Sequence, residues 1–243
     1  DRSKRRTSHL KEFQEKLSKL RFFDPACGCG NFLVLTYREL RLLGIEVLKE
    51  LHGVQQVTDI EHMSRIDVDQ MYGIEICEWP ARIAEVALWL LDHQMNQRLS
   101  EAFGQYYVRL PITATPHIVC GNALRLDWKA LLSPKECSYI LGNPPFVGKK
   151  EQTAEQKSDM DAVFGKAKGS GVLDYVCAWY VKAADYIQNT RIRTAFVSTN
   201  SITQGEQVGV LWSALFAKHS GLEIHFAHRT FAWQSEASGK AHV

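Results

Sequence analysis

Short apolar segments alternate along the chain with longer stretches in which apolar residues recur every three or four positions. The short segments predict buried strands, and the longer stretches predict helices with one apolar face. Strands are expected at residues 20–24, 71–76, 117–120, 139–141, 195–197 and 224–226, and helices at 2–19, 32–43, 80–91, 173–187 and 205–219. This alternation predicts an α/β fold with a doubly wound, mostly parallel sheet and helices on both faces.

Four segments fall outside this alternation. Residues 1–20 are expected to form a lead-in helix whose basic start, Lys4 to Arg6, is interpreted as a solvated helix end rather than an arm that binds DNA. Residues 52–70 are polar and acidic without a clear period, as expected of an inserted loop. Residues 148–171 mix lysines with acids and glycines, which fits a mobile, mildly basic flap and a plain solvated loop equally well. Residues 228–243 are typical of the start of a hairpin.

The amino-acid composition does not alter the predicted fold. Of the 243 residues, 45% are hydrophobic and 23% are charged, and the formal net charge of +2 neither demands nor excludes a nucleic-acid partner. No apolar run reaches membrane-spanning length and no signal peptide is recognisable, so we expect a cytoplasmic protein without a membrane partner. The chain begins without methionine and ends within what resembles a strand, so we expect it to be a piece of a longer protein.

The candidate metal ligands do not form a complete site. Cys27 and Cys29 are one residue apart, but no second cysteine pair or nearby histidines complete a tetrahedral zinc site. Glu155 and Lys157 have the spacing of half a metal-nuclease motif, yet no strand with an aspartate precedes them, and they are interpreted as loop residues. We therefore expect neither a metal nor DNA cleavage in this part of the protein.

Small or polar residues follow four of the expected strands. In an open α/β sheet the ligand lies beyond the carboxyl ends of the strands, so these residues should border one crevice. Gly28 and Gly30 allow a close approach of the backbone to a ligand, and Glu75 can accept hydrogen bonds from a ribose. Leu33 stands where a dinucleotide site would have its third glycine, which favours a nucleoside cofactor without a pyrophosphate. The four strand ends are Asp24 to Gly30, Glu75, Asn122, and Asn143 to Phe146.

Five stretches together resemble a known family. Residues 24–32, Asp-Pro-Ala-Cys-Gly-Cys-Gly-Asn-Phe, and residues 143–146, Asn-Pro-Pro-Phe, resemble motifs I and IV of S-adenosylmethionine-dependent DNA adenine methyltransferases in the γ-type order. Residues 173–180, 198–207 and 226–233 narrow the resemblance to the type IIL restriction-modification enzymes, the MmeI-like group, over nearly the whole chain. In that group one polypeptide holds endonuclease, methyltransferase and target-recognition regions.

The resemblance implies a Rossmann-like, class I methyltransferase domain over residues 21–243. It implies S-adenosylmethionine as the cofactor, double-stranded DNA with a flipped adenine as the substrate, and nuclease and target-recognition regions elsewhere in the same polypeptide. Many relatives carry serine at the position of Cys29 and aspartate at that of Asn122, although an amide can also hydrogen-bond an amino group. The resemblance places Glu75 beside the ribose of the cofactor, and Asn122 with Ala123 beside its adenine. The methionine part would be bordered by Asp24, Ala26, Gly28, Gly30 and Phe32. The expected cofactor site is completed by Pro25, Cys27, Asn31 and Ile76.

The Asn143-Pro144-Pro145-Phe146 turn suits methylation of an amino group. The Asn143 side-chain oxygen and the Pro144 carbonyl can each accept one amino hydrogen, and the prolines remove competing N–H donors. A target base inside a duplex must be flipped out, and stacking on Phe146 would return part of that cost. Phe231 is the candidate for the second face of the base. No metal or covalent intermediate is required.

Other functions remain open at this point. The same acceptor turn would serve methylation of a protein glutamine or an RNA base, and the fold could be kept as a DNA-docking scaffold without turnover. A cytosine-C5 methyltransferase is disfavoured because it needs a Pro-Cys nucleophile, and here the prolines precede Phe146.

Overall fold

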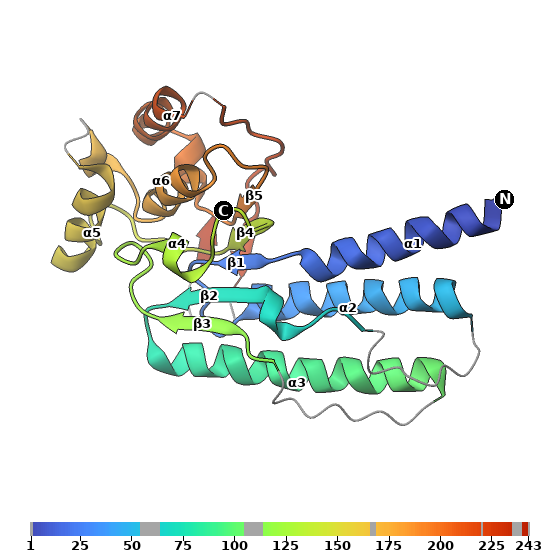
Figure 1. Cartoon of the computed structure of the whole chain (residues 1–243). Helices are drawn as coiled ribbons and strands as arrows, with labels where there is room; N and C mark the ends of the chain where they lie inside the picture. Colours follow the sequence, from blue (N-terminus) through green and yellow to red (C-terminus); the bar gives the residue numbers. More distant parts are fainter. Residues whose placement is uncertain are drawn as a thin grey trace.

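The computed structural model describes residues 2–53, 64–104, 114–165, 169–219, 221–234 and 240–242. Five parallel strands form one sheet in the order β3-β2-β1-β4-β5 (Figure 1). These strands are β1 (Phe22–Asp24), β2 (Met71–Glu75), β3 (His117–Cys120), β4 (Tyr139–Gly142) and β5 (Arg193–Phe196). The helices are α1 (Arg2–Lys19), α2 (Asn31–His52), α3 (Glu78–Phe103), α4 (Trp128–Leu131), α5 (Ala154–Phe164), α6 (Cys177–Tyr186) and α7 (Glu206–Lys218), with short 3-10 turns η1 (Val68–Gln70), η2 (Ser170–Val172) and η3 (Asn200–Thr203).

The strand order creates a switch point between β1 and β4. The chain builds the sheet outward from β1 to β2 and β3, and then returns to the other side of β1 for β4 and β5. In open α/β sheets, ligands bind where the strand order reverses, outside the carboxyl ends of the strands. The residues that follow β1 and β4 are therefore the first place to search for a site.

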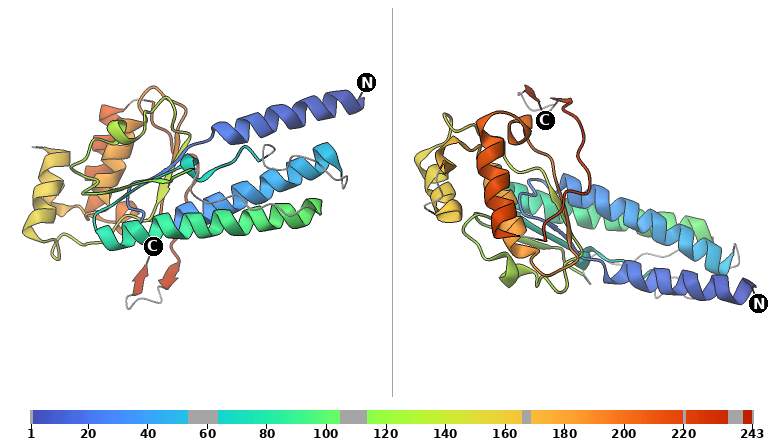
Figure 2. Two further views of the ribbon diagram at one scale, coloured as in Figure 1. Left: turned by 60° about the horizontal axis from the view of Figure 1, so that its bottom comes forward. Right: turned by 90° about the horizontal axis from the view of Figure 1, so that it is seen from above.

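Two hydrophobic cores cover the two faces of the sheet. Successive side chains of a strand point to opposite faces, and Phe22 accordingly lies in the core beneath α2 and α3, while Phe23 lies in the core beneath α4, α6 and α7. The long helices α1, α2 and α3 extend together beyond the sheet (Figure 2). The fold is thus the doubly wound α/β arrangement that the alternation of strands and helices predicts.

A polar cluster lies buried between α2 and α3. Arg41, only 1% exposed, donates to Asp92 Oδ1 at 2.7 Å and to Asn96 Oδ1 at 2.6 Å. Tyr37 Oη donates to Asp92 Oδ1 at 2.6 Å, and Asn96 Nδ2 donates to Asp92 Oδ2 at 3.0 Å. Each of these four side chains is paired within the cluster, which fixes how the two helices face each other. We call this set the α2–α3 polar cluster.

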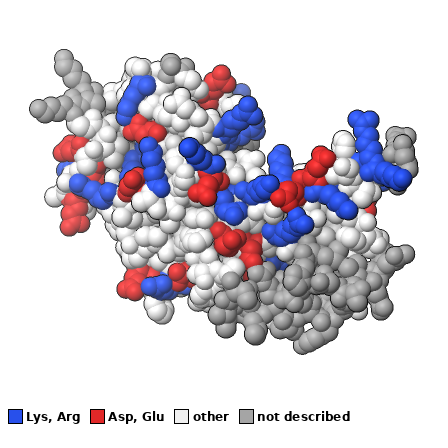
Figure 3. All heavy atoms as spheres, in the orientation of Figure 1, with Lys and Arg blue, Asp and Glu red and all other residues white. Residues whose placement is uncertain are grey.

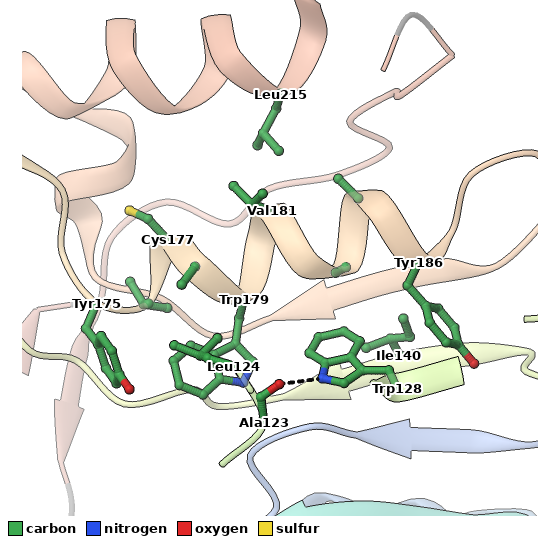
Figure 4. Packing of buried hydrophobic residues seen from close by; sticks show 14 of the residues in the cluster. Ala123, Leu124, Trp128, Ile140, Tyr175, Cys177, Trp179, Val181, Tyr186 and Leu215 are labelled. Atoms are coloured by element: carbon green, nitrogen blue, oxygen red, sulfur yellow. Dashed lines mark hydrogen bonds between the residues drawn. The ribbon is translucent and has the colours of Figure 1, made fainter. Parts of the chain in front are cut away.

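Helix α6 packs between the sheet and α7 (Figure 4). Trp179 points from α6 toward the sheet, and its indole Nε1 donates to the Pro25 carbonyl at 3.0 Å. Leu215 of α7 lies on the opposite side of α6 and is buried in the same core. This packing joins the second half of the chain to the turn that follows β1.

Two expectations for local structure were wrong. The segment 148–171, expected to be a loop or flap, contains helix α5, whose start is capped by reciprocal hydrogen bonds between Thr153 and Gln156. Glu155 and Lys157 therefore lie on a helix and not in a loop. The strand expected at 224–226 is not formed, and its Ile224 and Phe226 are mostly exposed. An apolar triplet forms a strand only when a neighbouring strand supplies its hydrogen bonds.

The hairpin expected near the C-terminal end of the chain is present. Strands β6 (Ala232–Gln234) and β7 (Lys240–His242) pair in the antiparallel direction. The insertion expected at 52–70 lies partly outside the described residues; its last part forms the 3-10 turn η1 before β2. No helix in the described part of the chain is long and apolar enough to cross a membrane.

Candidate active site

The turn after β1 is built by two glycines with different roles. Both have positive φ, +54° at Gly28 and +85° at Gly30, a conformation that other residues adopt only at a cost. A side-chain carbon on Gly30 would lie 2.9 Å from Ala84 Cβ, so this glycine lets α3 pack closely. At Gly28 such a carbon would meet no atom within 4 Å. Gly28 therefore presents backbone to open space, as a ligand-binding turn requires.

Glu75 at the end of β2 joins this turn to the next one. Its carboxylate accepts from the Gly28 backbone N–H at 3.0 Å and from the Cys77 backbone N–H at 2.9 Å. The Glu75 carbonyl accepts from the Gly121 N–H at 2.8 Å, so β3 ends beside it. A carboxylate has about four acceptor positions, which leaves capacity for a diol on the side chain. The next residue, Ile76, is 62% exposed and offers an apolar surface at the same edge.

Asp24 lies at the switch point with one oxygen unpaired. Its side chain is 1% exposed, and Oδ1 accepts from the Ala26 backbone N–H at 3.0 Å. Within the described residues, no donor reaches the buried Oδ2. Burial raises the pKa of the Asp24 carboxyl to about 7, the hydrogen bond from Ala26 opposes this, and the charge of Glu75 adds to it. A buried carboxylate of this kind can receive a cationic ligand group.

The turn after β4 carries the second unpaired acceptor. Among the described residues, no donor reaches the buried Oδ1 of Asn143. Asn143 follows Gly142, where a side-chain carbon would lie 2.5 Å from Asp24 Oδ1, so the two strand ends are in direct contact. Pro144 is buried and Pro145 is exposed. The two unpaired oxygens of Asp24 and Asn143 thus belong to adjacent strand ends on either side of the switch point.

A hydrogen-bond network from the second half of the chain holds this turn. The Val197 N–H donates to the Gly142 carbonyl at 3.0 Å, and the Tyr175 N–H donates to the Val147 carbonyl at 2.9 Å. Asp174, beside Tyr175, accepts from the hydroxyls of Thr199 and Ser201. The turn is therefore anchored on both sides by backbone, which presets its direction.

Asn122 after β3 is already engaged in hydrogen bonds. Its Oδ1 accepts from the Leu124 N–H at 2.9 Å, and its Nδ2 donates to Asp159 Oδ2 at 2.8 Å. The neighbouring Ala123 is buried, and its carbonyl accepts from Trp128 Nε1 at 2.8 Å (Figure 4). The side chain of Ala123 therefore packs in the core, and its carbonyl is used by a hydrogen bond inside that core.

The remaining predicted cofactor residues differ in how they are placed. Pro25 is buried, with its carbonyl bonded to Trp179. The Cys27 thiol is packed in the core beneath α2 and α3, where burial raises its pKa, so only its backbone remains for a ligand. Asn31 is exposed and Phe32 is half-buried in the first turn of α2, directly after Gly30.

The two candidate stacking residues lie in different surroundings. Phe146 is partly buried and packs against the core of α4, α6 and α7. Phe231 lies in the extended segment before β6 and is 49% exposed. The structure places Phe146 on the Asn143 turn, but it does not bring Phe231 into the core that Phe146 touches.

Several residues that support the site were not predicted individually. They are Asp159 of α5, Asp174 and Tyr175 of the segment just before α6, and Trp179 of α6. Their partners lie 16 to 154 residues away in the chain, so no local pattern points to the pairs. The Thr153–Gln156 capping box would have revealed α5, and with it the position of Asp159.

The arrangement fits a nucleoside cofactor with a cationic end. Asp24 supplies an unpaired buried oxygen, Gly28 supplies open backbone, and Ile76 supplies an exposed apolar face. Within the described ranges, no group of three His, Cys, Asp or Glu side chains is placed to hold a metal ion.

The chain is similar to DNA methyltransferases and to a restriction-modification enzyme. The family model for the MmeI DNA-methyltransferase domain matches residues 1–243. The chain is 40% identical over 237 residues to DNA methyltransferase A of Bacillus subtilis strain 168, which covers 96% of this chain and 26% of that protein. It is similar to the solved structure of the type IIL restriction-modification enzyme MmeI in complex with DNA, with 61% identity and a TM-score of 0.93 over 97% of this chain and 32% of that one. The chain therefore spans roughly a third or less of the proteins it matches.

Proposed function

The chain belongs to the family of MmeI DNA-methyltransferase domains, and we propose that it transfers a methyl group from S-adenosylmethionine to the N6 amino group of adenine in DNA. The family supports DNA methylation within a restriction-modification enzyme. The target atom and the methyl donor are inferred from the site.

The unpaired oxygen of Asn143 is the observation that favours an amino group as the methyl acceptor. Asn143 presents a buried oxygen without a partner, on a turn whose next two residues are prolines and so lack N–H groups. Leaving a buried acceptor unpaired costs about 1–3 kcal/mol, which a bound donor recovers. An amino group carries two hydrogens, and the Asn143 oxygen with the Pro144 carbonyl offers two acceptors.

These acceptors would activate the amino nitrogen by position. The lone pair of an exocyclic adenine nitrogen is delocalised into the ring, and two hydrogen bonds in suitable directions favour a tetrahedral nitrogen with the lone pair available. When bound, S-adenosylmethionine supplies the electrophilic methyl group. The Asn143 oxygen and the Pro144 carbonyl would keep the nitrogen lone pair directed at that methyl group, and the surplus amino proton would leave to water. Catalysis by this turn is orientation and electrostatic stabilisation, without a covalent enzyme intermediate.

The cofactor would be held across β1 and β2. We assign the Asp24 carboxylate to the cofactor's ammonium group, the Glu75 carboxylate to its ribose hydroxyls, and the Ile76 side chain to one face of its adenine. The Gly28 backbone would border the methionine part. Asp24 has an unpaired oxygen, Ile76 has an exposed apolar face and Gly28 has open space beside it, which support these assignments. Glu75 would use the acceptor positions that remain beside its two backbone hydrogen bonds.

The DNA base would enter from the side of the Asn143 turn. An adenine in a duplex cannot reach a buried acceptor, so it must be flipped out, at a cost of a few kcal/mol. Stacking on Phe146 and Phe231 would return about 1–3 kcal/mol for each ring. Basic and acidic side chains are interspersed over the face shown in Figure 3, so charge on that face does not by itself define a DNA path. We assign target recognition and DNA cleavage to other regions of a longer polypeptide, as the resemblance to type IIL enzymes implies.

A methyl-transfer assay with three substrates tests this function. The longer polypeptide that contains this chain is incubated with S-adenosylmethionine labelled in the methyl group and with duplex DNA, RNA or protein, and labelled DNA is digested to nucleosides. We expect label in DNA, as N6-methyladenine. Label in RNA or protein with none in DNA would assign the turn to another amino or amide substrate. Cofactor binding without transfer to any substrate would indicate a DNA-docking scaffold.

A further inference from the structure

A carboxylate from α5 reaches the end of β3 and bonds the Asn122 amide. Asp159 is 5% exposed, and its Oδ2 accepts from Asn122 Nδ2 at 2.8 Å and from Tyr175 Oη at 2.7 Å. Its Oδ1 accepts from Arg125 Nε at 2.5 Å. Asp159 thus links α5 and the start of α6 to the turn that we place beside the cofactor's adenine.

The count of hydrogen-bonding positions shows how Asp159 can act. A carboxylate has about four acceptor positions, and three of those on Asp159 are filled by the chain itself. Asp159 is therefore poorly placed to bind a ligand directly. Its effect on a ligand must pass through one of its three partners, and only Asn122 lies at a strand end of the candidate site.

The Asn122 amide is fixed at both ends. The Leu124 N–H requires the oxygen on one side, and the Asp159 carboxylate requires the NH₂ group on the other. An amide carries two acceptor positions and two donors, so one lone pair and one N–H remain. One donor beside one acceptor is the set that an asparagine uses to bind an adenine edge in two hydrogen bonds.

We propose that Asp159 is a positioning residue that locks the Asn122 amide in the one orientation that recognises the adenine of the cofactor. This inference rests on the proposed function, because it takes the ligand at this edge to be a nucleoside cofactor. It adds a selectivity device: without Asp159 only the Leu124 N–H holds the amide, so the flipped orientation costs one hydrogen bond instead of two and adenine loses part of its advantage over a base with the opposite pattern.

The electrostatics of Asp159 agree with this role. Burial raises its pKa, but the hydrogen bonds from Asn122, Tyr175 and Arg125 together outweigh burial, so the pKa lies below its ordinary value. The group is thus a carboxylate at neutral pH and can accept all three bonds. An asparagine at position 159 would turn its NH₂ group toward at least one of the three donors, Asn122, Tyr175 or Arg125, and that hydrogen bond would be lost.

Binding selectivity separates positioning from simple anchoring of α5. Calorimetry would measure the affinity of the protein for S-adenosylhomocysteine and for its inosine counterpart, in which the adenine amino group is replaced by oxygen. We expect the wild type to prefer the adenine ligand by about tenfold or more, the equivalent of one hydrogen bond of about 1.4 kcal/mol. Asp159→Asn should reduce this preference to less than about threefold, on the same scale.

A reciprocal exchange and a surface control complete the design. The double variant Asn122→Asp with Asp159→Asn keeps one carboxylate and one amide facing each other, and it should keep a preference for the adenine ligand. A carboxylate at 122 has acceptors only, so it should favour the adenine amino group at least as strongly as the wild type. Asp161→Asn, on the exposed side of the same helix, should leave both affinities unchanged.

Each outcome decides the inference. If Asp159→Asn lowers the melting temperature but keeps the wild-type preference, Asp159 only anchors α5 and the inference is overturned. If Asp159→Asn does not fold, the double variant decides, and loss of its adenine preference would overturn the inference. Failure of the wild type to bind either ligand would instead overturn the proposed function on which the inference rests.

Discussion

Two groups of buried polar side chains in this protein differ in whether all their members find hydrogen-bond partners within the group. In the α2–α3 polar cluster, Arg41, Asp92, Asn96 and Tyr37 satisfy one another through hydrogen bonds of 2.6 to 3.0 Å. At the switch point of the sheet, Asp24 and Asn143 each keep a buried oxygen for which the described residues offer no donor. Both groups are polar and buried, but only the first is complete within the chain.

The difference separates a structural cluster from a ligand site. Burying a polar group costs free energy unless a partner replaces water, and the large majority of buried polar groups in folded proteins are hydrogen-bonded. The α2–α3 polar cluster has its compensation in the fold. We infer that the compensation at the switch point comes from the cofactor and the substrate, so changes in the two groups should affect different properties.

The largest effect is expected from breaking the satisfied cluster. Arg41→Met should lower the free energy of unfolding by about 3–5 kcal/mol, because it leaves the Asp92 carboxylate buried without its cation. Methyl transfer per folded molecule should stay near the wild-type value. Urea denaturation and an activity assay at low temperature would measure the two quantities. The double variant Arg41→Met with Asp92→Leu should recover part of the stability; a loss of activity without a loss of stability would contradict the comparison.

A smaller effect, of a few kcal/mol at most, is expected from the charge of Asp24. Its folded pKa of about 7 lies above its unfolded value of roughly 3.9, so the protonated carboxyl favours the folded state. This contribution is fully present below about pH 4 and is lost as the pH rises through about 7. Asp24→Asn should remove this part of the pH dependence of stability, which chemical denaturation at several pH values would measure.

The same group should make cofactor binding depend on pH in the opposite direction. If the Asp24 carboxylate pairs with the cofactor's ammonium group, affinity should increase as the pH rises from 5 to 7, because Asp24 then loses its proton. Calorimetry of the wild type and of Asp24→Asn in parallel subtracts the titration of the cofactor itself. Equal pH dependence in the two proteins would remove Asp24 from the cofactor site.

The smallest effects are expected from the two candidate stacking rings. Phe231→Ala should weaken binding of duplex DNA or lower the transfer rate by the equivalent of about 1–3 kcal/mol, with little change in stability. Phe146→Ala should lower both activity and stability, because its ring also packs against the core. Phe231→Tyr keeps an aromatic face and serves as the control. Full activity of Phe231→Ala on duplex DNA would exclude this residue from the base site.

The sequence was sufficient for the elements whose pattern is local. The strands of the five-stranded sheet lie within about two residues of their expected positions because each pairs an apolar segment with a clear turn, as at Gly28 and Pro144. Their order in the sheet, with the switch point between β1 and β4, was not predicted and is a finding of the structure. Membership of the MmeI-like family was confirmed by the match over residues 1–243.

Features that depend on contacts between distant residues could not be predicted from the sequence. The residues at 224–226 have the composition of a strand, but whether they form one depends on a neighbour that the local sequence does not specify. Helix α5 was missed because lysines and glycines outweighed a short capping signal at Thr153. That Asp24 and Asn143 lie on adjacent strand ends with unpaired oxygens is a property of the packed structure, and the roles of the individual site residues stay proposals.

Asn143→Ala tests the central claim most directly. The variant removes the unpaired oxygen, so the fold should be as stable as the wild type or slightly more stable, and cofactor affinity by calorimetry should stay within about threefold. The rate of N6-methyladenine formation in duplex DNA should fall by about 10²-fold or more, as expected when a group that acts mainly in the transition state is removed. A stable variant that keeps most of the wild-type rate would contradict the account, because the buried oxygen of Asn143 would then serve neither the fold nor the reaction.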